Sequence, residues 1–240
     1  HTVKGQAMTE HTSKQYDAEL ESLRSRVLQM GGLVENQIVS AIEGLGASDT
    51  NIFKEVIRRE QEVNQIELEI DELCNHILAR RQPAAVDLRS VIVAIKMIRD
   101  LERIGDEAEK VARMGMMIAE AGKNFVPKVD LHRIASNAIA MLRKVLDSYA
   151  RVNAVSAAEV VRADLEVDDE FKAILRQLIT FMMEDPRTIS RSIEILFIAK
   201  AIERIGDHSK NMSEHVVYMV KGRDVRHQGP EKVAQEAQGN

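Results

Sequence analysis

A five-residue motif that occurs twice constrains the fold of this chain most strongly. Residues 102–106 read Glu-Arg-Ile-Gly-Asp, and the same five letters return at residues 203–207. Each copy lies late in a long segment whose apolar residues recur every three to four positions, which is typical of an amphipathic helix. Positions i and i+4 of a helix share one face. The repeat therefore predicts two related helical halves, each carrying a pair of neighbouring carboxylates.

The composition favours an all-α fold. Ala, Leu, Ile, Glu, Arg and Met dominate, while the 240 residues include only 4 Pro and no Trp. A net charge of −5 gives no general attraction to nucleic acid. The single cysteine, Cys74, excludes an internal disulfide framework and suits a reducing compartment. No apolar run approaches the roughly 20 residues of a membrane span, and no signal peptide is visible, so we expect a cytoplasmic protein.

Helix and loop signals divide the chain into two units of three antiparallel helices joined by short turns. Gly31 and Gly32 lie inside the first helix, which predicts a kink or a close neighbouring helix there. Stacking the two units gives a six-helix molecule with pseudo-twofold symmetry. The predicted boundaries are a disordered or vector-derived N-terminus (1–15), repeat one (16–121), a linker (122–128), repeat two (129–221) and a loose polar tail (222–240).

The preceding helix of each half carries a second acidic pair. Leu-Glu-Ile-Asp at residues 68–71 matches Leu-Glu-Val-Asp at residues 165–168. Each half therefore offers two carboxylate pairs with i, i+4 spacing, on consecutive helices. The eight predicted metal ligands are Glu67, Asp71, Glu102, Asp106, Asp164, Asp168, Glu203 and Asp207.

Counting residues from the hairpin turns tests whether the two pairs of each half lie level. In repeat two, the pairs lie about 19 residues before and about 18 after the turn at Pro186, so they face each other. In repeat one, the counts around Pro83 are about 14 and 21, an axial offset of roughly 10 Å at 1.5 Å per residue. Four facing carboxylates are thus better supported in repeat two.

Carboxylates on the apolar side of a helix need a partner that offsets their charge. On a helical wheel, Glu102 and Asp106 continue the apolar stripe of Val91, Ile95 and Ile98, and acids on a core-facing line are costly unless they are paired or bound to a metal. Clustered carboxylates also raise each other's pKa and attract hard cations. Oxygen ligands favour Mg, Mn, Ca or Fe over Zn, although the identity among these five stays open.

The repeated Glu-Arg-Ile-Gly-Asp motif also has structural explanations that do not involve a metal. Arg103 and Arg204 could hold the acids in an ion-pair network, and the motif glycines could serve only close helix packing. His208 has Glu107 as its counterpart, so we interpret it as a polar residue outside the repeat. A ferritin-like di-iron site would need a histidine three residues after each motif glutamate, and glycine stands there in both copies. No other catalytic motif is present, so we predict a protein that is not an enzyme.

Over roughly residues 16–225 the chain resembles the PhoU family of bacterial phosphate-uptake regulators. The residues that carry the resemblance are Ile70-Asp71-Glu72, Ile77 to Pro83, Asp87-Leu88-Arg89, Asp100 to Asp106, Met183 to Ile189, Ala201 to His208 and Lys221 to His227. The resemblance implies two tandem three-helix bundles whose E(D)xxxD motifs hold metal ions. Carried over, those motifs are the four pairs named above, with Asp164 replacing Glu. Ala201 stands where repeat one has Asp100, which weakens any role of Asp100 as a shared ligand.

The resemblance also implies a regulatory role. Members of the family repress the phosphate-starvation response by coupling the high-affinity phosphate ABC transporter, through its ATPase subunit, to a sensor histidine kinase, and they often form homodimers. The membrane would then be reached only through these partners, and no nucleic acid would be bound. Two other classes remain open: a metal-storage or redox helical protein, and a metal-free adaptor whose acidic faces bind basic patches on partners.

Overall fold

The computed structural model describes residues 3–122 and 124–239, and every regular element in these ranges is a helix. Repeat one consists of α1 (Val3–Ala47), α2 (Thr50–Arg81) and α3 (Ala85–Glu120), and repeat two of α4 (His132–Ala150), α5 (Ala154–Glu184) and α6 (Ile189–Lys221). A short 3-10 turn (Pro186–Thr188) leads into α6, and a final helix α7 (Pro230–Gln238) follows. The prediction of two tandem three-helix bundles is confirmed.

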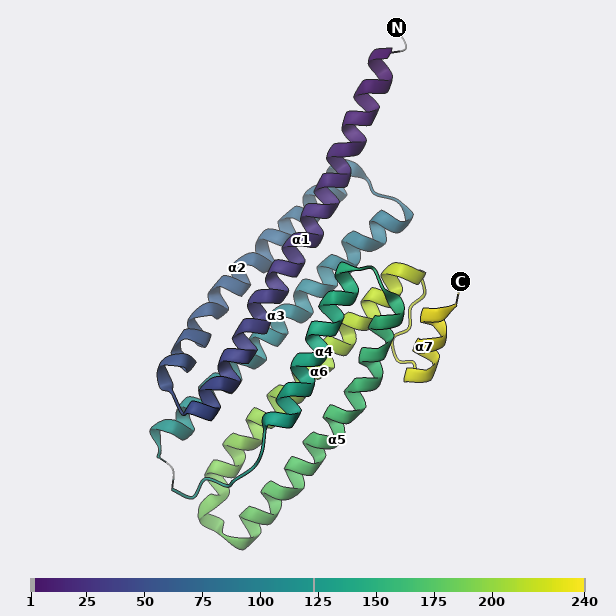
Figure 1. The fold of residues 1–240 in the computed structure, drawn as a ribbon. Coiled ribbons are helices and arrows are strands. Elements are labelled where there is room, and N and C mark those ends of the chain that lie inside the picture. Colours follow the sequence, from purple (N-terminus) through teal and green to yellow (C-terminus); the bar gives the residue numbers. More distant parts are fainter. Residues whose placement is uncertain (1–2, 123, 240) are drawn as a thin grey trace.

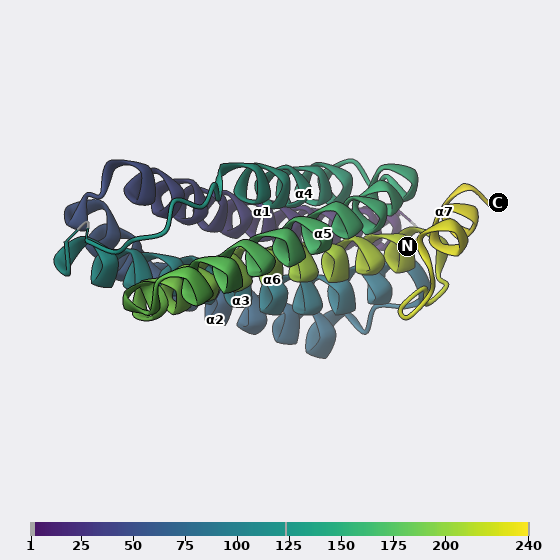
Figure 2. The same cartoon turned by 90° about the horizontal axis from the view of Figure 1, so that it is seen from below.

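The two bundles lie side by side with their long axes roughly aligned (Figures 1 and 2). Helices α3 and α6 form the most extensive helix–helix contact, and α1 also packs against α4. The chain runs in opposite directions along α3 and α6 (Figure 1), so the motif helices of the two repeats are antiparallel neighbours at the centre of the molecule. This arrangement places both copies of the motif close to the interface between the repeats.

The helix ends follow the local chemistry of the sequence. The side chain of Asp49 caps α2 by accepting from the backbone N–H of Asn51. Asp185 accepts from the N–H of Arg187 at the start of the 3-10 turn that precedes α6. Gly222 ends α6 with φ +70°, a left-handed conformation that glycine adopts without steric cost.

Close helix packing explains the glycines inside α1. A Cβ on Gly31 would lie 2.5 Å from Leu146 Cδ2 of α4, so the predicted close neighbour is confirmed, and it belongs to the other repeat. Gly32 has open space at the same point. The contact between α1 and α4 therefore depends on one of the two glycines.

Both ends of the chain differ from the expectation. Helix α1 begins at Val3, not near residue 16, and its N-terminal turns project beyond the other helices (Figure 1). The prediction of a loose tail was wrong, because α7 packs against α5 and α6. Val233 and Ala237 supply the buried face of α7, and their i, i+4 spacing is the apolar signal that the polar neighbours obscured.

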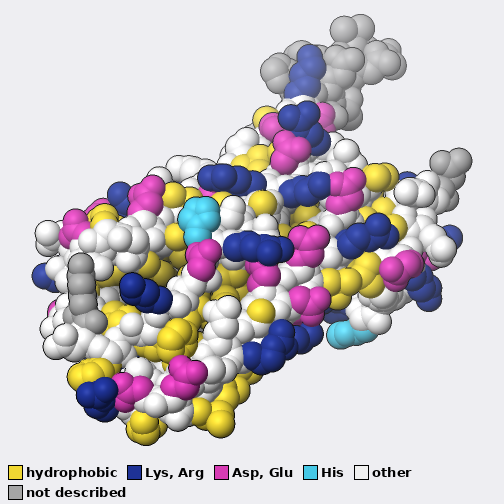
Figure 3. Space-filling view, turned by 60° about the horizontal axis from the view of Figure 1, so that its bottom comes forward, with side chains coloured by type: hydrophobic (Ala, Val, Ile, Leu, Met, Phe, Trp, Pro, Cys, Tyr) yellow, Lys and Arg dark blue, Asp and Glu magenta, His cyan; other side chains and the backbone are white. Residues whose placement is uncertain are grey.

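The surface carries interspersed charges of both signs, and hydrophobic side chains gather toward the end of the molecule at the α5–α6 turn (lower left of Figure 3). Cys74 is buried, as expected for a packing residue. None of the helices in the described ranges combines the length and apolar character needed to cross a bilayer.

Candidate metal site

The carboxylates of repeat two converge between α5 and α6. One oxygen from each of Asp164, Asp168 and Asp207 can be chosen so that the three lie within 4.8 Å of one another. Over the described residues, this is the one group of three such ligands that lies close enough to share an ion. Glu203 lies one helical turn before Asp207, is 8% exposed, and has Lys200 Nζ 2.6 Å from its Oε2. The three aspartates are below called the repeat-two site.

Burial and mutual repulsion dominate the electrostatics of this site. Asp164 is only 1% exposed. Its Oδ2 accepts a hydrogen bond from Lys210 Nζ at 2.9 Å, whereas its Oδ1 has no hydrogen-bond partner. Burial raises the pKa of Asp164 despite the Lys210 ammonium. Burial, followed by repulsion from Glu203, Asp164 and Asp168, raises the pKa of Asp207 to about 6.

These residues fit a hard cation. An orphaned, fully buried carboxylate oxygen is normally satisfied by a donor, a water or an ion. Three oxygens from two helices match the chemistry that Mg, Mn, Ca and Fe prefer. A cation here would offset the carboxylate repulsion and join α5 to α6.

The four predicted ligands of repeat one are arranged differently. Glu102 and Glu67 are half-buried and Asp106 is exposed, so the expectation that Asp106 points toward the core was wrong. Burial raises the pKa of Glu102, helped by the nearby charges of Asp106 and Glu67. Asp71 affects the pKa of Glu67, but it is not among the main influences on Glu102 or Asp106. Glu67, Glu102 and Asp106 therefore influence one another electrostatically.

Another acid, Glu60, occupies the position that repeat two gives to Asp164. A Cβ on Gly105 would lie 2.8 Å from Glu60 Oε2, and a Cβ on Gly206 would lie 3.6 Å from Asp164 Oδ1. Each motif glycine thus faces a buried carboxylate of the preceding helix. The residue four after Glu60 is Asn64, which corresponds to Asp168. In repeat one, Glu60 therefore lies near Glu102 and Asp106, which both influence its pKa, and Asn64 stands where repeat two has a second aspartate.

The axial count contained the signal that identifies Glu60. The offset of roughly 10 Å in repeat one equals about seven residues at 1.5 Å each, and Glu60 is seven positions before Glu67. The short motif Leu-Glu-Ile/Val-Asp aligns Glu67 with Asp164, and Glu67 lies seven residues, or about two helical turns, after Glu60. The apolar residues at both registers repeat with the same period, so sequence similarity alone did not distinguish them.

The pKa of Glu60 is also strongly perturbed. It is 5% exposed, and Gln37 Nε2 donates to its Oε2 at 3.0 Å. Its Oε1 and the Oε1 of Gln37 have no hydrogen-bond partner. Burial raises the pKa of Glu60 to about 7, with further repulsion from Asp106, Glu109 and Glu102.

Polar contacts across the α3–α6 interface connect the two motif segments. Asp100 accepts hydrogen bonds from His208 Nδ1 at 2.9 Å and Asn211 Nδ2 at 3.5 Å, and His215 Nε2 lies 3.4 Å away. Arg204 Nη1 lies 3.2 Å from Glu107 Oε1. His208 is therefore an interface residue and not a bystander, and Arg204 pairs with the opposite repeat. The missing counterpart of Asp100 in repeat two is consistent with an interface role rather than a ligand role.

Comparison with known proteins identifies the family. The PhoU domain model matches residues 27–114 and 131–216, one match in each repeat. A Pseudomonas putida protein named phosphate-specific transport system accessory protein PhoU homolog is 45% identical over 237 residues, covering 99% of this chain and 93% of that protein. The Escherichia coli K12 protein named phosphate-specific transport system accessory protein PhoU is 44% identical over 227 residues, covering 94% and 93%.

Solved structures agree with this result. The crystal structure of PhoU from Pseudomonas aeruginosa matches with a TM-score of 0.83 and 46% identity, covering 87% of this chain and all of that one (100%). PhoU from Streptococcus pneumoniae, described as a phosphate transport system regulatory protein, matches with a TM-score of 0.82 and 27% identity. With matches in both repeats, close relatives over nearly the whole chain and the same arrangement of helices, the chain belongs to the PhoU family.

Proposed function

We propose that this chain regulates phosphate uptake and represses the phosphate-starvation response when phosphate is plentiful. The observation that carries the proposal is the similarity of nearly the whole chain, at 45% identity, to a protein named as an accessory protein of the phosphate-specific transport system. A regulator of this kind acts by binding, without turnover of its own. Its partners would be the ATPase subunit of the phosphate ABC transporter and the phosphate-sensor histidine kinase, on the cytoplasmic side of the membrane.

An apolar stripe on α6 supports a protein-binding role. Ile189, Ile193 and Phe197 are 42%, 42% and 51% exposed. Their spacing of four residues places them on one face of the helix. Exposed apolar surface of this kind commonly marks a protein interface. We assign this face to the transporter's ATPase subunit, since the relatives are named as accessory proteins of the transport system.

Metal binding is the second part of the proposal. Asp164, Asp168 and Asp207 would hold one hard divalent or trivalent ion in repeat two, with Glu203 at its edge. In repeat one, Glu60, Glu102 and Asp106 would hold a second ion, supported by Glu67. The buried, unpartnered Asp164 Oδ1 favours this proposal over a metal-free acidic adaptor. The ion would fix the spacing of α5 and α6, and with it the apolar face of α6.

The regulatory proposal is tested by deleting the gene in its host under phosphate sufficiency. Starvation genes should become constitutive and phosphate should over-accumulate, and the wild-type gene should restore repression. Phe197→Ser should restore it poorly and should lose co-purification of the ATPase subunit. Ile179→Ser is the matched control, because Ile179 is 44% exposed on α5, outside the stripe. Repression that persists in the deletion strain would contradict the regulatory assignment.

A further inference from the structure

Lys210 is the one cation that the structure places in hydrogen-bond contact with the repeat-two site among the described side chains. Its Nζ donates to Asp164 Oδ2 at 2.9 Å, and its own side chain is 35% exposed. Burial lowers the pKa of Lys210, but the hydrogen bond to Asp164 and the surrounding carboxylates outweigh this effect and raise it overall. The Lys210 ammonium, 2.9 Å from Asp164 Oδ2, offsets part of the negative charge of the acidic cluster.

The same ammonium opposes a metal ion. A cation bound by Asp164, Asp168 and Asp207 would lie within a few ångströms of Lys210 Nζ, where the two positive charges repel each other. The carboxylate that Lys210 neutralises is also the one with a free, fully buried oxygen, Asp164 Oδ1. Lys210 and a metal ion would therefore share one carboxylate, with Lys210 at Oδ2 and the ion at Oδ1, and their positive charges would oppose each other.

A second acceptor lies one turn further along α6. Glu214 is 7% exposed, four residues after Lys210, and so shares its helix face. Glu214 is among the carboxylates that raise the pKa of Lys210, and burial raises the pKa of Glu214 itself while Lys210 opposes that shift. Because Lys210 and Glu214 are four residues apart on one helix face, Glu214 is the carboxylate of α6 placed to receive an ammonium that leaves Asp164.

Repeat one lacks this cation. The residue 101 positions before Lys210, at the same place relative to the motif, is Glu109. Glu109 pairs with Arg113 and adds to the repulsion on Glu60. The two halves therefore differ: in repeat two a lysine donates directly to the buried aspartate, whereas in repeat one Arg103 and Lys110 act on Asp106 through their charge and Glu109 adds to the repulsion on Glu60.

We propose that Lys210 is an internal counter-cation of the repeat-two site, and that a divalent cation bound there repels its ammonium from Asp164 toward Glu214. Lys210 thereby lowers the metal affinity of this site, and in the metal-free protein it joins α6 to Asp164 of α5. This inference rests on the proposed metal-binding function. It makes the repeat-two site responsive to changes in metal concentration instead of being permanently filled.

The test measures Mn²⁺ binding by calorimetry in the full chain. An Asp106→Asn background removes one repeat-one carboxylate, so that the signal comes from repeat two. Lys210→Met should bind Mn²⁺ about tenfold more tightly than the background protein, a change of about 1.4 kcal/mol. Without metal its melting temperature should fall, because Asp164 loses its partner, and saturating Mn²⁺ should restore it. Lys172→Met is the matched control, because Lys172 lies exposed on α5 and pairs with Asp169 outside the site.

Each result of the Mn²⁺ binding experiment either supports or contradicts the proposed role of Lys210. Lys210→Gln, which keeps a donor for Asp164 without the charge, serves if the methionine variant does not fold, and it should also bind more tightly. Mn²⁺ binding that is equal or weaker in the Lys210 variants overturns the role of Lys210 and leaves the metal site intact. If neither the background protein nor the variants bind Mn²⁺, the metal proposal and this inference both fail. Binding that appears only in the Lys210 variants supports the inference most strongly.

Discussion

The surroundings of the buried Glu60 carboxyl favour its neutral form. Its carboxylate faces Gly105 so closely that a Cβ there would lie 2.8 Å from Glu60 Oε2, and a larger residue would force the Glu60 side chain to shift. Gln37 supplies one hydrogen bond, and the second carboxylate oxygen has none. A protonated Glu60 would gain a donor that can reach an acceptor such as Gln37 Oε1. The folded state therefore favours the neutral acid, which agrees with a pKa raised to about 7.

This raised pKa predicts a pH-dependent stability. A carboxyl with a raised pKa in the folded state stabilises the fold below its unfolded pKa and loses that contribution as the pH rises through the folded value. Between about pH 4.5 and pH 7 the free energy of unfolding of the metal-free protein should fall by roughly 3 kcal/mol on account of Glu60. Glu60→Gln should remove this component in urea titrations at pH 5 and pH 7.5. Glu62→Gln, on the exposed face of α2, is the control, and an unchanged pH dependence in Glu60→Gln would contradict the account.

The contact between α3 and α6 joins the two repeats through polar side chains around Asp100. Asp100 receives hydrogen bonds from His208 and Asn211 of α6, and His215 lies close by. Burial alone would raise the pKa of Asp100, but the bonds from His208 and His215 outweigh it and hold the pKa below its ordinary value. The ionised form is therefore stabilised in the fold. This contribution is present at neutral pH and is lost as the pH falls through the folded pKa.

Substitution at this contact should weaken the packing of the two repeats. Asp100→Asn should lower the free energy of unfolding at pH 7 by about 2 kcal/mol, the usual contribution of hydrogen bonds to a charged group. Asp147→Asn should change it by less than about 0.5 kcal/mol, because Asp147 pairs with Arg151 on the exposed surface. Chemical denaturation of both variants measures the difference. Equal stability of the two variants would show that the Asp100 contacts do not hold the repeats together.

Some helices and helix contacts follow from the sequence, and others do not. Six helices and their order followed from the period of the apolar residues and from Pro83, Gly122 and Gly222. The helix α7 was missed because only Val233 and Ala237 of its nine residues form the buried face. The proximity of Glu60 to the motif glycine of α3 was not predicted, because Glu60 is followed four residues later by Asn64 and does not complete the acidic motif. Residues that meet across the two repeats, such as Asp100 and His208, could not be paired without knowing which helices are neighbours.

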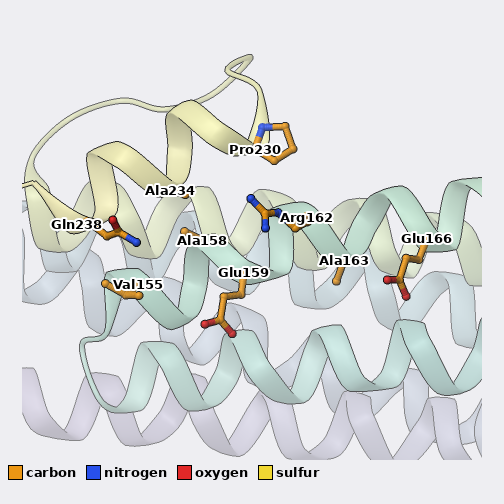
Figure 4. Close-up of a pocket in the computed structure, with 9 residues that line it drawn as sticks. All are labelled: Val155, Ala158, Glu159, Arg162, Ala163, Glu166, Pro230, Ala234 and Gln238. Atoms are coloured by element: carbon orange, nitrogen blue, oxygen red, sulfur yellow. The ribbon is translucent and has the colours of Figure 1, made fainter.

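The internal duplication produces two similar bundles whose acidic residues are arranged differently. The repeat-two site has three aspartate oxygens within reach of one another and the Lys210 ammonium beside them. The repeat-one site has Glu60, Glu102 and Asp106, with Glu109 nearby. Helix α7 lies over α5 and leaves a groove lined by Glu159, Arg162 and Glu166 of α5 and by Pro230, Ala234 and Gln238 of α7 (Figure 4). That groove lies on α5 near the acidic site without including its aspartates.

The molecule therefore combines the fold of a phosphate-transport accessory protein with a carboxylate site suited to one hard ion. The regulatory proposal follows from the relatives, and the metal proposal from the geometry of Asp164, Asp168 and Asp207. The two are linked by α6, which carries both Asp207 and the exposed stripe of Ile189, Ile193 and Phe197. An ion at Asp207 would thus act on the same helix that we assign to the transporter's ATPase subunit.

Metal analysis of the full chain purified without chelators tests this account most directly, with Asp207→Asn compared to the wild type. We predict that the substitution lowers the metal content by about one ion per chain while the helical circular dichroism signal is unchanged, because a ligand is lost and no core volume is. Asp169→Asn, which lies beside the site on the exposed side of α5, should keep the wild-type content. Equal metal content in the wild type and Asp207→Asn would contradict the account and would favour a metal-free network in which Lys210 alone neutralises the aspartates.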